Sequence, residues 1–206
     1  MAFDAYMVFT DHAGTPIKGE SQVTWSDSSP LGSGIQGGNL FEIDDFNFDI
    51  EQVLNIGSQS SGAGAGKVTF NPFNITRKTD RASPIFFSMC CAGTHFKEVF
   101  LLLRRAGGSG ATVANAQGTA MTSGYTFLKF SFGLVAVKTI SWSGSDGDES
   151  PKEEVAFEYG ALKAEYIQQG TDGQPMVGDP GQTVGSWVRV NNTSNFDAFI
   201  AAYKAT

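Results

Sequence analysis

YTFLKFSFGLVAVKTISW, residues 125–142, is the stretch of sequence that decides the fold. Aromatic and β-branched residues dominate it, and such residues favour the pleated, half-buried surface of a sheet. We therefore expect one very long strand here, or a bent one. Gly133 is the residue where a bend is expected, because glycine inside a strand commonly marks a bulge or a sharp bend.

Strong strand patterns lie on both sides of this stretch. Residues 96–105 (FKEVFLLLRR) precede it, and residues 154–167 (EVAFEYGALKAEYI) follow it. Weaker patterns predict further strands at 5–10, 20–25, 41–49, 67–78 and 186–190. Pro72 lacks a backbone donor, so the strand over 67–78 is expected to be bulged there or to lie at an edge.

Residues 83–92 (SPIFFSMCCA) form the clearest predicted helix. Ser83 suits the N-cap, Pro84 suits the first helical position, and Gly93 suits the residue after the C-terminal end. The segment is apolar almost all round and spans about two and a half turns, so it must pack on a sheet to be stable. A second short helix is predicted within 195–204, where aromatic and aliphatic residues recur at helical spacing.

The composition agrees with a β-rich protein. The chain holds 17 Phe and 25 Gly among 206 residues, which favours strands joined by many turns. Eight or more strands around one short helix would leave exposed edges unless the sheet closes. We therefore predict a mainly β fold, a single closed or nearly closed barrel spanning residues 1–206.

The net charge of −7 argues against a nucleic-acid partner, because an acidic surface repels phosphate backbones. No run of 18 apolar residues is present, so we expect no membrane insertion. The N-terminal sequence has neither a basic region nor an apolar stretch, which predicts that no signal peptide is cleaved. We expect a protein made for the cytoplasm that leaves it, if at all, by another route.

Sequence patterns for nucleotide, metal or redox chemistry are weak. Residues 62–67 (GAGAGK) resemble a phosphate-binding loop, but Ser61 and Val68 stand where that motif needs Gly and Ser or Thr. The adjacent Cys90 and Cys91 rarely satisfy disulfide geometry and read as inert thiols. We expect no bound cofactor and no metal.

The carboxylates and histidines also lack a catalytic arrangement. The acidic residues at 44, 45, 49 and 51 are typical of a solvated strand face rather than a paired-carboxylate glycosidase site. Residues 146–149 (DGDE) lack the EF-hand spacing for Ca²⁺. His12 and His95 fit surface or capping positions. An enzyme is therefore not expected.

Several sequence blocks, in this order, resemble the Hcp (haemolysin-coregulated protein) family of type VI secretion systems. The blocks are IKGES (17–21), GAGAGKV (62–68), RKTDRASP (77–84), FSMCCAGTHF (87–96), VKTISWSG (137–144) and EVAFEYGALKAEY (154–166). Gln168-Gln169 and Asp172-Gly173 also fit. The resemblance covers residues 3–187 and leaves 188–206 as a C-terminal extension.

This resemblance implies a small barrel of two sheets flanked by one helix. It also implies hexameric rings that stack into a tube, are propelled by a sheath with a spike, and carry effectors. Such a protein is cytoplasmic until assembly and is then secreted without a cleaved signal peptide. The chain departs from the family in an expanded first loop at 11–16, a long excursion at 106–124, and the extension after Trp187.

Ring stacking needs a loop that projects along the ring axis. The best candidate is the glycine-rich loop 26–38, which offers apolar contacts amid polar residues. The candidate stacking residues are Ser29, Pro30, Leu31, Ile35 and Gln36. Alternative functions are a tube protein of another contractile injection or phage-like assembly, a monomeric binding module that uses its loops, and a hydrolase with an unrecognised site.

Overall fold

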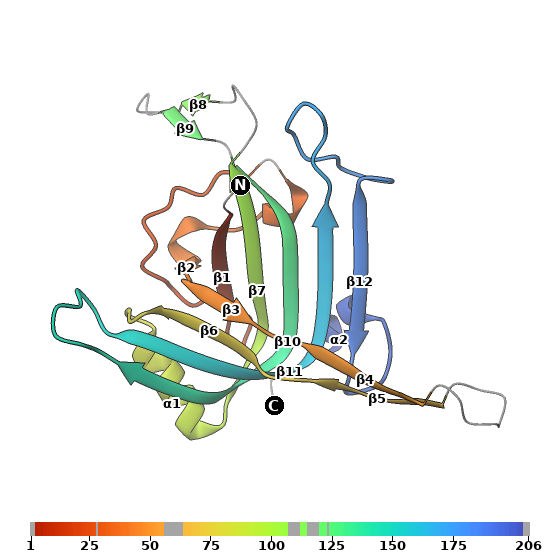
Figure 1. Ribbon diagram of the computed structural model, residues 1–206, viewed down its shortest axis with the longest axis horizontal. Coiled ribbons are helices and arrows are strands. Elements are labelled where there is room, and N and C mark those ends of the chain that lie inside the picture. Colours follow the sequence, from red (N-terminus) through yellow and green to blue (C-terminus); the bar gives the residue numbers. More distant parts are fainter. Residues whose placement is uncertain are drawn as a thin grey trace.

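The computed structural model describes residues 3–27, 29–55, 64–106, 112–114, 120–122 and 124–203. The chain is mostly β, with two short α-helices (Figure 1). The strands are β1 (Asp4–Thr10), β2 (Phe41–Glu42), β3 (Asp45–Asn47), β4 (Ile50–Asn55), β5 (Gly64–Phe70), β6 (Phe73–Lys78), β7 (His95–Ala106), β8 (Thr112–Ala114), β9 (Ala120–Thr122), β10 (Gly124–Ser143), β11 (Lys152–Ile167) and β12 (Gln182–Val188). The helices are α1 (Ser83–Ala92) and α2 (Phe196–Ala202), with 3₁₀ turns η1 (Pro30–Gly32) and η2 (Gly37–Asn39).

One antiparallel sheet contains eight of the strands, in the order β2-β1-β7-β10-β11-β6-β3, with β12 also paired to β11. The first two thirds of β10 pair with β7, whereas the rest pairs only with β11. In the same way, β11 pairs with β6 at its start and with β12 at its end. The two long strands thus run through both halves of a strongly curled sheet (Figure 1). The predicted mainly β, barrel-like fold with one flanking helix is confirmed.

The predicted bend in β10 lies one residue further along than expected. Leu134, rather than Gly133, has a positive φ of 52°. It falls between the register pairs Gly133–Ala161 and Val135–Tyr159, opposite Gly160. A Cβ atom on Gly160 would lie 3.2 Å from Leu134 Cδ2, so the glycine across the ladder makes room for the bent residue. Gly133 instead makes room for α2, because a Cβ atom added there would lie 2.7 Å from Ile200 Cδ1.

Phenylalanine rings fill the curled sheet. The buried Phe9 ring contacts four others, with centroid distances of 4.8 Å to Phe86 and 5.7 Å to Phe157 among them. Phe73 and Phe132 stack at 4.5 Å. Aromatic pairs at such distances contribute about 0.5–1.5 kcal/mol beyond their buried area. The abundance of Phe in the sequence is therefore explained by the core.

The helix predicted at 83–92 is present with those bounds, but its N-cap differs from the prediction. Ala82 occupies the cap position, and Ser83 is the first helical residue. The Ser83 hydroxyl instead accepts hydrogen bonds from the Asp80 backbone N–H and from Arg77. Gly93 ends the helix in the left-handed region, with φ 64°, as expected.

Three of the weaker strand predictions need correction. Residues 20–25 form no strand and instead cross the outer sheet face, where Trp25 packs against Tyr6. The pattern at 41–49 divides into the short strands β2 and β3. The pattern at 67–78 divides at Asn71–Pro72 into β5 and β6, because proline cannot continue the ladder.

The strands β4 and β5 form a separate two-stranded hairpin. In Figure 1 it extends away from the curled sheet. Of the glycine-rich loop predicted at 57–66, residues 57–63 are outside the described residues, and residues 64–66 belong to β5. Within the excursion predicted at 106–124, the described part contains the small hairpin of β8 and β9.

The predicted C-terminal helix is α2, and it packs on the outer face of the sheet. Phe196 is buried against Ala161 and Val188. Asp197 forms an ion pair with Lys163 at 2.8 Å. Neither helix is long and apolar enough to cross a membrane, as far as the described residues extend.

Candidate assembly surfaces

The loop predicted to mediate stacking is anchored to the barrel through Asp27. Its carboxylate accepts hydrogen bonds from the Thr126 backbone N–H at 3.0 and 3.1 Å and from the Ser29 N–H at 2.8 Å. The Thr126 hydroxyl also donates to it. A Cβ atom on Gly32 would lie 1.9 Å from Asp27 Oδ2, so only glycine fits beside this carboxylate.

Arg104 of β7 holds the same loop from a second side. Its side chain is 8% exposed and donates to the carbonyl oxygens of Ser26 and, at 3.3 Å, of Gly124. Its guanidinium carbon lies 4.9 Å from the centre of the Trp25 ring. The Trp25 indole in turn donates to the Gly32 carbonyl oxygen at 3.0 Å. The base of the loop is therefore fixed by side chains of β7 and β10.

The five candidate stacking residues divide into two groups. Ser29 and Leu31 are buried: the Ser29 hydroxyl accepts from the Leu31 N–H at 3.1 Å, and Leu31 is 4% exposed. Ile35 is half-buried on the cluster around Tyr6. Pro30 and Gln36 are exposed. Of the five candidates, Pro30, Gln36 and part of Ile35 are therefore accessible on the loop, whose surface also includes the exposed Ser33 and Gly34.

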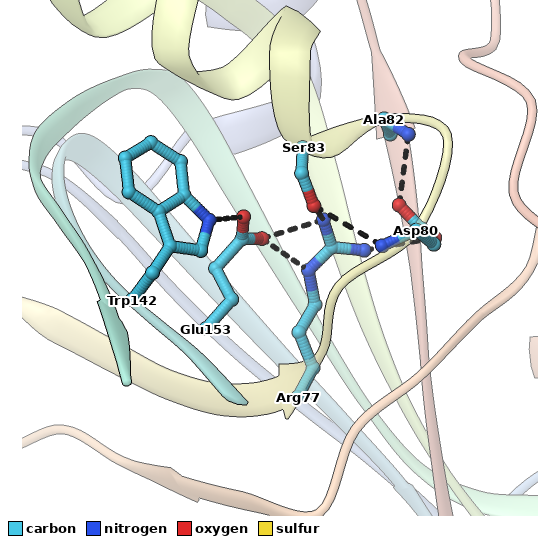
Figure 2. Close-up of polar contacts among 6 residues, drawn as sticks. All are labelled: Arg77, Asp80, Ala82, Ser83, Trp142 and Glu153. Carbon is cyan, nitrogen blue, oxygen red and sulfur yellow. Dashed lines mark hydrogen bonds and ion pairs between the residues drawn. The ribbon is translucent and has the colours of Figure 1, made fainter. Parts of the chain in front are cut away.

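A second anchored region lies beneath α1, where five side chains form a polar network centred on the buried Arg77 and Glu153 (Figure 2). Arg77 of β6 is 1% exposed and contacts Glu153 Oε1 of β11 at 2.6 and 2.8 Å. Arg77 also reaches Asp80 Oδ2 at 2.9 Å and donates to Ser83 Oγ at 3.1 Å. Glu153 Oε2 accepts from the Trp142 indole at 2.7 Å.

This network positions α1 and the exposed Trp142. The guanidinium carbon of Arg77 lies 4.7 Å from the centre of the Phe86 ring of the helix. Trp142, 47% exposed, contacts Phe87 with ring centroids 6.1 Å apart. Sequence reasoning missed the network because Arg77 and Glu153 are 76 residues apart. The only local signal was the basic strand end before the helix.

Two charged residues on the outer sheet face are partly desolvated. Burial raises the pKa of Glu98 of β7, against the opposing effect of nearby Lys129 and Lys163. Burial also lowers the pKa of Lys129 of β10, whose amine lies 4.1 Å from the centre of the Phe100 ring. This face lies between the loop anchored by Asp27 and the helix α2.

Of the residues weighed as enzyme or metal sites, Asp44 and the turn residues Asp148 and Glu149 line one shallow cavity together with Lys78 and Lys152. The acidic residues at 44, 45, 49 and 51 are exposed, and Asp49 accepts from the Asn71 amide at 2.6 Å. Within the described ranges, no group of three His, Cys, Asp or Glu is placed to hold a metal ion. His12 is exposed in a turn, and His95 contacts Tyr203. Of the glycine-rich motif at 62–67, residues 62 and 63 are outside the described residues, and the rest begins a strand.

A family model described as "Type VI secretion system effector, Hcp" matches residues 6–166, which is most of the chain and nearly all of the curled sheet. The chain belongs to the Hcp family. Protein hcp1 of Pseudomonas aeruginosa is 27% identical over 107 residues, which cover 52% of this chain and 58% of that relative. The alignment thus spans less than two thirds of the relative.

Solved structures extend the likeness in fold over nearly the whole chain. A structure titled as a type six secretion system protein aligns with a TM-score of 0.70 at 21% identity, covering 94% of this chain and all of the other. Hcp1 from Salmonella typhimurium aligns with a TM-score of 0.61 at 24% identity, covering 94% and 99%. At these identities the structures show a shared fold.

Proposed function

We propose that this chain is a structural subunit that forms hexameric rings, which stack into the inner tube of a type VI secretion system. The match of the Hcp family model over residues 6–166 carries the proposal. The chain acts by assembly rather than by catalysis, and it needs no cofactor. Its partners are further copies of itself, with the sheath, spike and effector proteins of the machine.

The physical demands of such a subunit agree with the molecule. A ring needs two different surface patches that meet between neighbouring copies, and closure by rotation then uses both patches on every copy. The barrel supplies a rigid body for this purpose. In this proposal the protein is made in the cytoplasm and leaves it as part of the assembled tube, and residues 1–206 act as one unit.

Stacking is assigned to the loop anchored by Asp27 and Arg104. Of the five candidate residues, Pro30, Ile35 and Gln36 are accessible and would contact the next ring, while Ser29 and Leu31 hold the loop in shape. A loop with a fixed base loses less conformational freedom when it is sandwiched between rings. This favours it over an unanchored loop as a stacking contact.

Electron microscopy with light scattering tests this proposal. The wild-type chain should form rings and tubes, and the double substitution Pro30→Glu with Gln36→Glu should leave rings but abolish tubes, because the added carboxylates would lose hydration against a ring whose subunits already carry a net charge of −7. Leu31→Ala is the matched control, since it weakens the packing of the loop without adding charge. Tubes that persist in the charged variant would contradict the stacking assignment, and a monomeric wild type would favour a binding module instead.

A further inference from the structure

The helix α2 is a short cover on the outer face of the sheet, and it lies beyond the residues 6–166 that the family model matches. It has seven residues, and isolated helices shorter than about 12 residues are marginal in water. The Phe196 ring is buried against Ala161 and Val188, whereas the other residues of α2 are half-buried or exposed. The helix α2 is therefore stable only while it is docked on the sheet.

The seat of α2 lies beside Glu98 of β7. A Cβ atom added to Gly133 of β10 would lie 2.7 Å from Ile200 Cδ1 and 3.3 Å from Phe196 Cε2, so α2 rests directly on this glycine. Glu98 is the register partner of Gly133. Directly paired residues of an antiparallel ladder place their side chains on the same face. Because Gly133 has no side chain to shield Glu98, the cover on this side of Glu98 comes from α2.

Glu98 has no ion-pair partner of its own. Lys163 is engaged by Asp197 of α2 at 2.8 Å and by Glu165 at 3.6 Å. Among the described residues, neither Glu98 nor Lys129 forms an ion pair. The charged groups that act on Glu98 are Lys129 of β10, Lys163 of β11, Asp197 of α2 and the neighbouring Lys97 of β7. An ionised Glu98 would thus lie near a like charge on the docked helix.

The docked helix affects how tightly Glu98 holds its proton. Burial raises the pKa of Glu98, and the Asp197 carboxylate raises it further, while Lys129 and Lys163 oppose both effects. When α2 leaves the sheet, Asp197 leaves with it and Glu98 meets water, so the pKa falls back toward its ordinary value of 4.5. The docked state therefore binds this proton more tightly than the undocked state. Docking is strongest below pH 4.5 and weakens as pH rises through the raised pKa.

We propose that α2 is a pH-sensitive latch, which covers the outer sheet face while the Glu98 carboxyl is protonated and loosens when that carboxyl ionises. On opening, Lys163 exchanges Asp197 for Glu98 as its partner. Opening also uncovers the apolar seat formed by Gly133, Ala161 and Val188. The latch is a property of the single chain, so it stands whether or not rings form.

Hydrogen exchange of α2 at pH 5 and pH 8, corrected for intrinsic exchange rates, tests the latch. In the wild type, protection of residues 199–202 should fall at the higher pH, by up to about tenfold for each unit by which the pKa of Glu98 is raised. Glu98→Gln stays neutral and should keep α2 protected at both pH values. Glu154→Gln, on the exposed side of β11, is the matched control and should behave as the wild type. Protection that does not change with pH in the wild type, or a pH dependence that survives in Glu98→Gln, would overturn the proposal.

A histidine close to α2 needs a variant of its own. His95 contacts Tyr203, which follows the last residue of α2, and histidine side chains commonly change charge between pH 5 and 8. His95→Gln should retain the pH-dependent protection of α2. Loss of that dependence in His95→Gln would show that Glu98 is not the switch.

A titration of the Glu98 carboxyl by NMR measures the linkage from the other side. Phe196→Ala removes the ring that seats α2 and changes no charge. The pKa of Glu98 should lie above 4.5 in the wild type and should be lower in Phe196→Ala, in which residues 199–202 exchange fast at both pH values. An equally raised pKa in the variant, with α2 undocked, would show that the sheet alone sets it and would contradict the latch.

Discussion

Two buried arginines hold opposite regions of this molecule, and they do so differently. Beneath α1, Arg77 faces two carboxylates, Glu153 and Asp80, and the Ser83 hydroxyl. At the loop, Arg104 has backbone carbonyl oxygens and the Trp25 ring as partners. No carboxylate in the described part of the chain forms an ion pair with Arg104, and its buried Nε has no hydrogen-bond partner.

The difference indicates which region is rigid and which can rearrange. When a buried arginine that is paired with carboxylates leaves its site, the carboxylates remain buried without a counter-charge, which is costly. An arginine bound to carbonyl oxygens can exchange them for water or for another partner at a lower cost. The helix end is therefore held more rigidly than the loop end, where the partners of Arg104 can be exchanged at a lower cost.

The largest expected effect follows from Arg77→Met, which leaves Glu153 buried without its counter-charge. Removing one partner of a buried pair costs about 3–5 kcal/mol, so urea denaturation should show a loss of that size. The double substitution Arg77→Met with Glu153→Leu should recover much of it, because the fully buried carboxylate is gone and only the partly exposed Asp80 loses its ion-pair partner. The exposed neighbour Glu154→Ala is the control, with a change within about 0.5 kcal/mol. If Arg77→Met were as stable as Glu154→Ala, the buried ion pair would not stabilise the helix end, and the contrast between Arg77 and Arg104 would be wrong.

The substitution Asp27→Ala should have the second-largest effect on stability. The Thr126 and Ser29 N–H groups lose their acceptor, at a cost of about 1–3 kcal/mol. Because Asp27 anchors a loop rather than the core, the loss should be local. Hydrogen exchange should accelerate at residues 29–36 and at Thr126, while α1 stays protected. Exchange that accelerates equally in α1 would show that the two regions are coupled.

Arg104→Met should cost less than Arg77→Met, about 1–2 kcal/mol, because the carbonyl partners of Arg104 can turn to water. Thermal unfolding of the two variants side by side measures the difference. Equal destabilisation by both substitutions would contradict the distinction between a rigid end and an adjustable end.

The smallest expected effect is the change of folding stability with pH that Glu98 causes. Its pKa is raised in the folded state, so the folded chain binds this proton more tightly than the unfolded chain. Stability should therefore fall as pH rises from the ordinary glutamate pKa of 4.5 through the raised pKa. Glu98→Gln should remove this slope and gain up to about 0.5 kcal/mol at neutral pH. If the dependence of stability on pH were unchanged in Glu98→Gln, it would have to come from other titrating groups.

Local patterns in the sequence were sufficient for the barrel, the bounds of α1 and the long strands β7, β10 and β11. Residues close in sequence decide these features, through side-chain alternation and the Pro84 and Gly93 signals. The anchors were beyond prediction because they join distant residues: Asp27 and Thr126 are 99 positions apart. The bend at Leu134 likewise depends on Gly160 across the ladder.

The candidate stacking loop was located by its composition, but composition did not distinguish its two groups of residues. Leu31 looked available for contacts between rings, yet it is buried against the chain's own barrel. It lies in the 3₁₀ turn that Ser29 caps, next to the anchored base of the loop. The stacking role of the outer residues stays a prediction.

The mass and shape of the purified wild-type chain test the central claim most directly. Light scattering with negative-stain imaging should show rings of six copies of the 21.9 kDa chain, about 131 kDa, which stack into tubes at higher concentration. A stable monomer of 21.9 kDa, with no rings at any concentration, would contradict the account.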